Sequence, residues 1–257
     1  MEGGKRLVSY RLLSAIGWNR TIRSRDDVRK CESRMSLTYV IPDIHGRYDL
    51  LGEALAGISA RSGGEAGVIV TIGDYVDKGP QSKEVIDRML SGVTRGWHLV
   101  ALKGNHDAMM VEALRDPAKM ASWIEKGGDA ALASYGGDPA DVPPSHIAWL
   151  DRLRLMHVDA HRLYVHAGVD PDIPLERQSE VTLLWKRYPK GFSEGFGDLH
   201  VVHGHDNYPD GPQLYQGRTN LDTQAWRTGR LMVGIFDDRR AGGPVDFIVV
   251  RGPPAGP

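Results

Sequence analysis

Three apolar runs in the first half of the chain each end at a residue with a side-chain oxygen. The runs predict buried strands at residues 37–41, 68–72 and 97–102. Asp43, Asp74 and Asn105 follow them at equal spacing, as repeated strand–helix units of one length would place them. Helical patterns lie between the runs, so the predicted order is β-α-β-α-β. Because such units form parallel strands, their polar residues should gather at the carboxyl edge of one sheet.

The second half of the chain continues the pattern with histidines. A predicted strand at 163–165 runs into His166, and a later one runs into His205. Residues 107–160 are predicted to be mostly helical. Late strands are predicted near 219–223, 231–236 and 247–250. We therefore predict an α/β (α+β) fold with a central β-sandwich of mixed sheets flanked by helices.

Composition limits the classes of protein and partner. The 257 residues suit one large domain, and 41% hydrophobic with 25% charged residues is typical of a globular protein. The net charge of −1 gives no global attraction, so neither nucleic acid nor membrane is expected as a partner. The single cysteine, Cys31, fits a reducing compartment, and no apolar run is long enough to cross a membrane. A cytoplasmic location is therefore expected.

The N-terminal stretch differs from the rest because it is rich in lysine and arginine. We expect residues 1–34 to form a basic, disordered extension and residues 35–257 to form the ordered domain. An organelle-targeting peptide and a natural start at Met35 are the alternatives.

Six side chains at the strand ends form a candidate metal-binding set: Asp43, His45, Asp74, Asn105, His166 and His205. Carboxylate oxygen, imidazole nitrogen and amide oxygen suit Mn²⁺, Fe or Zn²⁺ better than Ca²⁺. Two metals about 3.5–4 Å apart need a bridging carboxylate, and Asp74 is predicted to bridge because its strand lies centrally. Asp43 and His45 are expected on one side and the other three ligands opposite. A water between two such ions loses a proton near neutral pH and becomes a nucleophile.

Each of these residues alone has a simpler explanation. A lone histidine is more often a core or surface residue, and a Gly-Asp pair after a strand is usually only a turn. The set is different because five segments place such residues at strand-to-loop junctions. The remaining histidines are interpreted as structural. His203, two residues before His205, is interpreted as a neighbour of the site.

The five segments resemble motifs of the PPP-type metallophosphoesterases. This family includes serine/threonine protein phosphatases and symmetrical diadenosine tetraphosphate hydrolases. The motifs are Pro42-Asp43-Ile44-His45-Gly46, Gly73-Asp74-Tyr75-Val76-Asp77-Lys78-Gly79, Gly104-Asn105-His106-Asp107, His166-Ala167-Gly168 and His203-Gly204-His205. The resemblance covers about residues 37–237 and looks closest to bacterial protein phosphatases. It implies a calcineurin-like metallophosphoesterase domain with two divalent metal ions, Mn²⁺ being expected and Fe or Zn²⁺ being the alternatives.

The resemblance also implies roles around the metals. His106 is expected to protonate the leaving oxygen as general acid, with Asp77 as its orienting partner. Lys78 and Arg187 are expected to contact the substrate phosphate, although a surface role is the alternative for Arg187. Arg47 is equally compatible with a phosphate contact and a surface role.

Two residues depart from the family pattern. Pro42 replaces the usual glycine before the first aspartate, which fixes φ and removes a donor. Lys78 replaces the usual arginine, and lysine meets phosphate as a point charge without a two-pronged contact. The final motif also lacks the second histidine of nuclease members, which argues against nuclease activity.

The predicted function is hydrolysis of phosphomonoesters, above all phosphoserine or phosphothreonine in proteins, by a hydroxide that two metals activate. The alternative enzyme is a symmetrical dinucleoside polyphosphate (diadenosine tetraphosphate) hydrolase. Such enzymes tend to lack the carboxylate at the position of Asp77, so its presence favours the phosphatase. A third alternative is a catalytically inactive binding module, which should have lost a ligand or the acid. The expected partner is a phosphoprotein or a small phosphoester.

Overall fold

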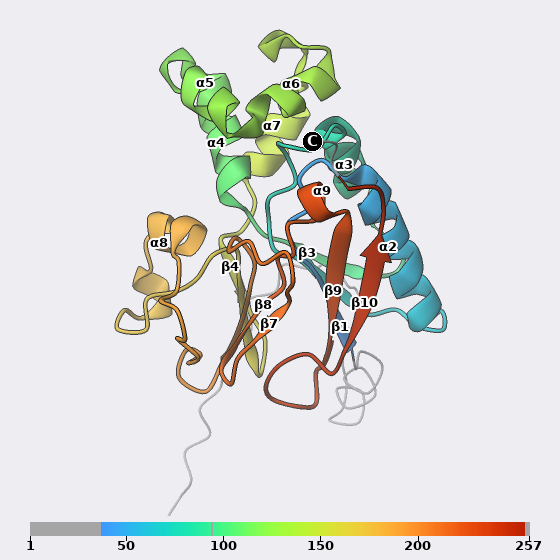
Figure 1. The fold of residues 1–257 in the computed structure, drawn as a ribbon, viewed down its shortest axis with the longest axis vertical. Coiled ribbons are helices and arrows are strands. Elements are labelled where there is room, and N and C mark those ends of the chain that lie inside the picture. Colours follow the sequence, from blue (N-terminus) through green and yellow to red (C-terminus); the bar gives the residue numbers. More distant parts are fainter. Residues whose placement is uncertain (1–36, 94, 255–257) are drawn as a thin grey trace, which may run out of the picture. The chain divides into compact units, whose positions relative to one another are not determined.

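The computed structural model describes residues 37–93 and 95–254, and the predicted extension at 1–34 lies outside the described residues. Two five-stranded sheets form its centre (Figure 1). The first has the order β10 (Asp246–Arg251), β9 (Arg230–Asp237), β1 (Leu37–Ile41), β2 (Val68–Thr71) and β3 (His98–Ala101). The second has the order β4 (Met156–Val158), β5 (Arg162–Val165), β6 (His200–His203), β8 (Arg218–Asn220) and β7 (Gln213–Leu214).

Both sheets are mixed. Strands β1, β2 and β3 pair in parallel, with Val40 opposite Val70 and Val70 opposite Val100. Strands β5, β6 and β8 are also parallel, whereas β9, β10, β4 and β7 join their sheets antiparallel. The parallel strands of each sheet therefore end at a common edge, which is where the sequence predicts the polar residues.

The two sheets pack face to face. Val40 and Phe236 of the first sheet share one buried cluster with Tyr164 and Val202 of the second. Neighbouring residues point the other way, since Tyr39 belongs to the cluster beneath the helices. This alternation follows from the two-residue period of a strand, and it confirms the predicted β-sandwich of mixed sheets flanked by helices.

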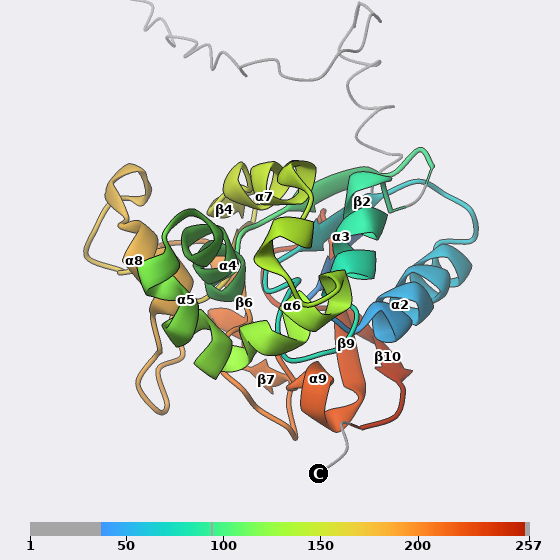
Figure 2. The ribbon, with the colours of Figure 1, turned by 90° about the horizontal axis from the view of Figure 1, so that it is seen from above.

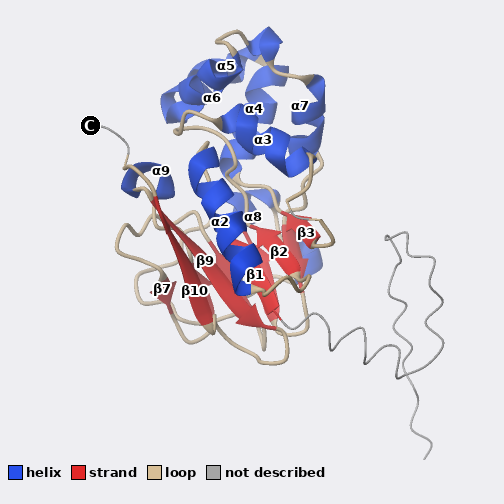
Figure 3. Cartoon of the chain, turned by 90° about the vertical axis from the view of Figure 1, so that its right-hand side faces the viewer, coloured by secondary structure: helices blue, strands red, loops and turns tan. Residues whose placement is uncertain are grey.

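Helices cover the outer faces and the strand ends. They are α2 (Tyr48–Arg61), α3 (Ser82–Leu90), α4 (Asn105–Arg115), α5 (Pro117–Trp123), α6 (Asp129–Tyr135), α7 (Pro144–Asp151), α8 (Glu180–Trp185) and α9 (Ala225–Thr228). Short turns of other helix types lie at η1 (Ile124–Gly128), η2 (Pro139–Asp141) and η3 (Leu175–Arg177). Helices α4 to α7 gather above the strand ends in both views (Figures 2 and 3). None of the helices within 37–254 is long and apolar enough to span a membrane.

The structure corrects one part of the predicted helical region 107–160. Residues 156–158 form the strand β4, because Met156 lies opposite Val165 and the pair extends the second sheet. Met156 and Val165 are 9 residues apart in the sequence, and local periodicity alone does not show that they pair in a sheet.

Candidate metal centre

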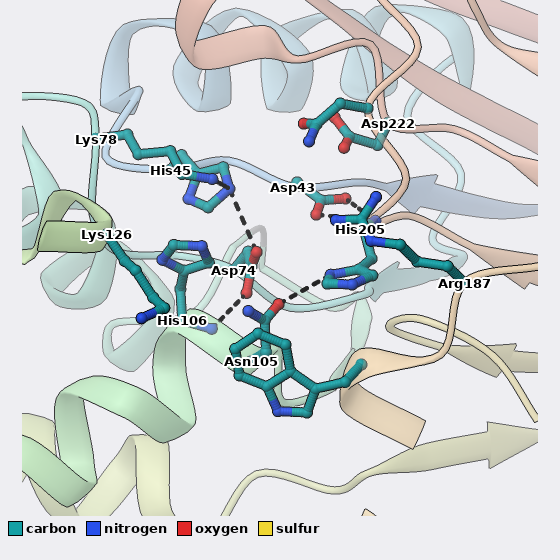
Figure 4. A pocket seen from close by; sticks show the side chains of 12 residues that line it. Asp43, His45, Asp74, Lys78, Asn105, His106, Lys126, Arg187, His205 and Asp222 are labelled. Carbon is teal, nitrogen blue, oxygen red and sulfur yellow. Dashed lines mark hydrogen bonds and ion pairs between the residues drawn. The ribbon is translucent and has the colours of Figure 1, made fainter. Parts of the chain in front are cut away.

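Five of the six predicted ligands are drawn together in Figure 4, and Nε2 of the sixth, His166, lies 2.8 Å from Oδ1 of Asn105. Each follows the carboxyl end of a strand, and Asn105 is also the first residue of α4. All have side chains that are at least nine-tenths buried: Asp43, His45, Asp74, Asn105, His166 and His205. Both sheets contribute, so the site lies where the ends of the two parallel strand sets meet.

Asp74 lies at the middle of the cluster. Its Oδ2 is 3.3 Å from Nε2 of His45, and its Oδ1 is 3.6 Å from Nε2 of His166. Two groups of candidate metal-binding atoms share it: His45 with Asp74 and His106, and Asp43 with Asp74 and His166. The carboxylate is therefore placed to bridge. The predicted division of the ligands between two metal ions placed Asp43 and His45 on the same side of Asp74. It differs from this grouping and stays a prediction.

Two imidazole rings are oriented by backbone carbonyls. Nδ1 of His45 donates to the Val76 carbonyl at 2.8 Å, and Nδ1 of His166 donates to the Ile72 carbonyl at 3.0 Å. A carbonyl can only accept, so the proton of the neutral ring lies on Nδ1 and Nε2 carries a lone pair. Burial is the main cause that lowers the pKa of both histidines, which favours the neutral, metal-binding form.

Acceptor atoms converge around Asn105. Its Oδ1 lies 2.8 Å from Nε2 of His166 and 3.0 Å from Nδ1 of His205. Because Nε2 of His166 has no proton in the tautomer above, two lone pairs face each other there. Near His45, the Lys78 ammonium donates to the free Nε2 at 3.0 Å. The candidate ligand atoms thus attract positive charge. Their oxygen and imidazole nitrogen atoms fit a divalent transition metal.

His106 and Asp77 form a second, tightly held pair. Nδ1 of His106 lies 2.7 Å from Oδ2 of Asp77. The Asp77 carboxylate is fully buried and also accepts from the indole nitrogen of Trp123 at 2.9 and 3.0 Å. The ring of His106 is therefore fixed through one nitrogen while the residue lines the pocket. Trp123 lies 46 residues from Asp77 in the sequence, so only the folded structure reveals this contact.

Asp107 joins two of the strand-end loops. Its carboxylate accepts from the backbone amides of Asp74 and Tyr75, both at 2.9 Å, and of Gly104 at 2.7 Å. Gly104 lies so close that a Cβ there would overlap the Asp74 carboxylate. The sequence contains Asp107 in a motif, but only the folded loops reveal this function in holding Asp74.

Backbone strain concentrates at the site. The described residues include six non-glycine positions with positive φ, and five of them belong to the predicted site: His45, Asp74, Asp77, Lys78 and His205. Such conformations cost on the order of 1–3 kcal/mol each and persist where the surroundings fix them. Their clustering indicates a functional rather than a purely structural junction.

One pocket exposes the cluster to solvent. It is lined by Asp43, His45, Asp74, Lys78, Asn105, His106, Lys126, Trp185, Arg187, His205, Asn207 and Asp222. Lys126, Trp185, Asn207 and Asp222 were not predicted as site residues. Burial raises the pKa of the Asp222 carboxyl to about 6. The pocket therefore combines acidic candidate metal ligands with three cationic side chains, from Lys78, Lys126 and Arg187.

The predicted arginines have different environments. Arg187 lines the pocket, and its Nη1 donates to Oδ1 of Asp206 at 2.9 Å, which leaves the other donors of the guanidinium available. For Arg47 a phosphate contact and a surface role are equally expected from the sequence, and the structure shows neither, because Arg47 is buried and is not among the residues that line the pocket. Its guanidinium is buried, pairs with both oxygens of Asp49 and donates to the carbonyl of Pro253. Asp49 accepts hydrogen bonds from two nitrogens of the guanidinium, and the contact with Pro253 joins the start of α2 to the C-terminal segment.

His203 lies beside the site without joining it. Its Nδ1 donates to the Gly204 carbonyl at 3.0 Å, and its Nε2 accepts from Arg218 at 2.9 Å. Both ring nitrogens are therefore engaged, and His203 is a neighbour of the cluster in the described structure.

The chain is similar to known proteins in sequence and in fold. The family model described as calcineurin-like phosphoesterase matches residues 37–249. Serine/threonine-protein phosphatase 2 of Escherichia coli (strain K12) is 35% identical over 213 residues, covering 75% of this chain and 89% of that protein. The symmetrical bis(5'-nucleosyl)-tetraphosphatase of Pseudomonas syringae pv. syringae (strain B728a) is 33% identical over 108 residues, 41% of this chain and 33% of that protein.

Solved structures show the same fold. A putative diadenosine tetraphosphatase has a TM-score of 0.60 at 24% identity, covering 85% of this chain and 94% of its own. A cold-active protein tyrosine phosphatase has a TM-score of 0.54 at 18% identity, covering 84% of this chain and 78% of its own. At these identities the likeness concerns the fold alone.

Proposed function

Because the chain belongs to the calcineurin-like phosphoesterase family, we propose that it hydrolyses phosphoserine and phosphothreonine monoesters in proteins. It is a phosphoric ester hydrolase by family and by its phosphatase-named relatives, so the inactive binding module is not retained. The choice of monoester rests on one observation, the 2.7 Å contact between His106 and Asp77. A serine alkoxide is a poor leaving group, and this pair can supply its proton.

Two divalent cations are the proposed cofactors, with Mn²⁺ first and Fe or Zn²⁺ as alternatives. The residues that would hold them are Asp43, His45, Asp74, Asn105, His166 and His205. When bound, such ions lower the pKa of a bound water and stabilise the negative charge that develops on the phosphate.

The remaining steps belong to side chains of the chain itself. The hydrogen bond from Nδ1 to Asp77 leaves Nε2 of His106 to carry a proton to the leaving oxygen. Arg187, held by Asp206 at 2.9 Å, can direct its free N–H groups to phosphate oxygens. Lys78 adds a point charge. Together they would orient the phosphate so that the leaving oxygen lies on the side of His106.

Hydrolysis of dinucleoside polyphosphates is the second candidate function. Three cationic side chains line the pocket, which suits a chain of several phosphates as well as one. The tetraphosphatase named above, at 33% identity over 108 residues, supports the same candidate.

Turnover of two substrates separates these candidates. We would measure kcat/KM for a phosphoserine peptide and for diadenosine tetraphosphate with Mn²⁺, using the full chain. The phosphatase proposal expects a higher value for the peptide. Asp77→Asn should lower peptide turnover strongly while the exposed control Lys119→Gln leaves it unchanged. A clear preference for the nucleotide would refute the proposal and favour the second candidate.

Partner, location and domain boundaries are proposed on the same basis. The family supports a phosphoprotein or small phosphoester as partner. The net charge of −1 supports the absence of nucleic acid and membrane partners, and the single cysteine supports the cytoplasm. Residues 35–257 are proposed as the metallophosphoesterase domain and 1–34 as a separate extension. Fluorescence microscopy of the tagged full chain tests the location. The activity of a chain starting at Met35 tests the domain boundaries.

A further inference from the structure

A short turn carries Lys126 to the pocket. This turn, η1, is fixed on both sides to the loop that carries Asp77, the partner of the proposed acid His106. On one side, the indole of Trp123 donates to Asp77 at 2.9 Å. On the other, the carbonyl of Gly127 accepts from the backbone amide of Lys78 at 3.0 Å. The position of Lys126 therefore depends on the loop that carries Asp77, whose carboxylate contacts His106.

The turn is kinked at Gly127, where the backbone packs against Lys78. Gly127 has a φ of 103°, and a Cβ there would lie 2.8 Å from Cγ of Lys78. The non-helical angles of Gly127 make η1 a kink between two helical segments. Lys126 precedes this kink, one turn after Ser122, and its side chain lines the pocket.

The ammonium group of Lys126 is held in place. Its Nζ donates to Oγ of Ser122 at 2.9 Å and lies 3.3 Å from the Ser122 carbonyl. The residue is exposed, yet it lines the same pocket as His106. In Figure 4, Lys126 and Arg187 approach the site from opposite sides. A phosphate held by Lys78 and Arg187 would therefore present its leaving group toward His106 and Lys126.

We propose that Lys126 is a specificity-determining residue that binds a negatively charged group carried by the leaving group of the substrate. The proposal deepens the proposed function, on which it rests for the direction of the leaving group. The shared chemistry is an anion close to the scissile ester. It has two possible sources: an acidic side chain next to a phosphoserine, or a second phosphate in a diphosphate.

Peptide turnover tests the first source. Two phosphoserine peptides would differ only in whether glutamate or glutamine follows the phosphoserine, and kcat/KM would be measured for both with Mn²⁺. The wild-type chain should prefer the glutamate peptide by roughly threefold, the scale of an exposed ion pair. Lys126→Gln should remove the preference, and Lys126→Arg should keep it. Lys119→Gln, an exposed lysine outside the pocket lining, should leave it unchanged.

Binding tests the second source without turnover. Calorimetry on the Mn²⁺-loaded protein would compare the dissociation constants of pyrophosphate and orthophosphate. Lys126→Gln should weaken pyrophosphate binding by roughly threefold more than orthophosphate binding. A variant that keeps the wild-type preference in both experiments overturns the proposal. If wild type hydrolyses p-nitrophenyl phosphate but neither peptide, the proposed function fails, and the pyrophosphate comparison alone decides on Lys126.

Discussion

The indole nitrogen of Trp123 donates to both carboxylate oxygens of Asp77, at 2.9 and 3.0 Å. Both side chains are buried, and the same carboxylate lies 2.7 Å from the ring of His106. Trp123 is therefore a positioning residue for the proposed acid, although it comes from a helix 46 residues further along the chain.

Replacing Trp123 by phenylalanine should impair the acid and spare substrate binding. Phe keeps most of the buried surface but removes a hydrogen bond to a charged group, which contributes about 1.5–3 kcal/mol. We expect kcat for a phosphoserine peptide to fall roughly tenfold with little change in KM. The loss should be smaller for p-nitrophenyl phosphate, whose leaving group needs less protonation. An equal loss for both substrates would contradict the positioning role.

His106→Asn should expose the same dependence on the leaving group more strongly. Removing a general acid costs about 10²–10⁴-fold in rate. We expect a loss in this range for the phosphoserine peptide and a clearly smaller one for p-nitrophenyl phosphate, both measured as kcat. Unchanged turnover of the peptide would show that another group donates the proton.

Asp74→Asn should disrupt metal binding and catalysis together. The proposed bridging residue loses its negative charge, whereas the side chain keeps its size. Hydrolysis of p-nitrophenyl phosphate with Mn²⁺ should fall by roughly 10³-fold, and wild-type activity should disappear on addition of a chelator. Atomic emission spectroscopy should find less metal per chain in the variant. Wild-type metal content with wild-type activity would refute the bridging assignment.

Lys78→Arg should strengthen the phosphate contact. Arginine offers a planar fork to two oxygens, whereas the lysine now present offers a single ammonium group that lies 3.0 Å from His45. We expect KM for a phosphoserine peptide to fall by roughly two- to fivefold. Lys119→Arg serves as the control outside the pocket. An unchanged or higher KM would mean that Lys78 does not contact the phosphate.

His200 should make the free energy of unfolding depend on pH. Burial, with Arg162 nearby as the second cause, lowers the pKa of His200 from 6.5 to about 4. Between these values the unfolded state binds a proton that the folded state does not, so stability falls as the pH falls. From pH 8 to pH 5 this residue should cost about 2 kcal/mol.

Urea unfolding of the metal-free protein at the two pH values checks this. His200→Gln has no titrating ring and can still reach Thr219, which now lies 2.9 Å from Nε2. The variant should therefore lose less stability on acidification than wild type. The same loss in both proteins would contradict the assignment.

The strand ends could be predicted because their signal is local. The apolar runs before Asp43 and Asp74 are continuous, and β1 and β2 lie within one residue of the predicted ranges. Parallel β-α units then bring the ends together by a general rule of such folds. The gathering of the candidate ligands follows from that rule, whereas their binding of metal remains a prediction.

Contacts between distant segments could not be predicted in this way. Arg47 follows a ligand motif closely, but Asp49 and the carbonyl of Pro253, 206 residues away, determine where its guanidinium lies. Lys126 looks like an ordinary surface lysine in the sequence. The fold places it at the pocket, beside the contact between Gly127 and Lys78. Side-chain direction in such cases depends on tertiary structure, for which one sequence carries no local signal.

The left-handed backbone at His45, Asp74 and His205 restricts which amino acids these positions can hold. Apart from glycine, that conformation is tolerated best by asparagine, aspartate and histidine, and worst by β-branched residues. These same three residue types supply the oxygen and nitrogen atoms of the candidate centre. The left-handed backbone and the chemistry of the candidate centre therefore favour the same three residue types at these positions. A substitution that suits the turn but not the ligand set, or the reverse, satisfies only half of what each position demands.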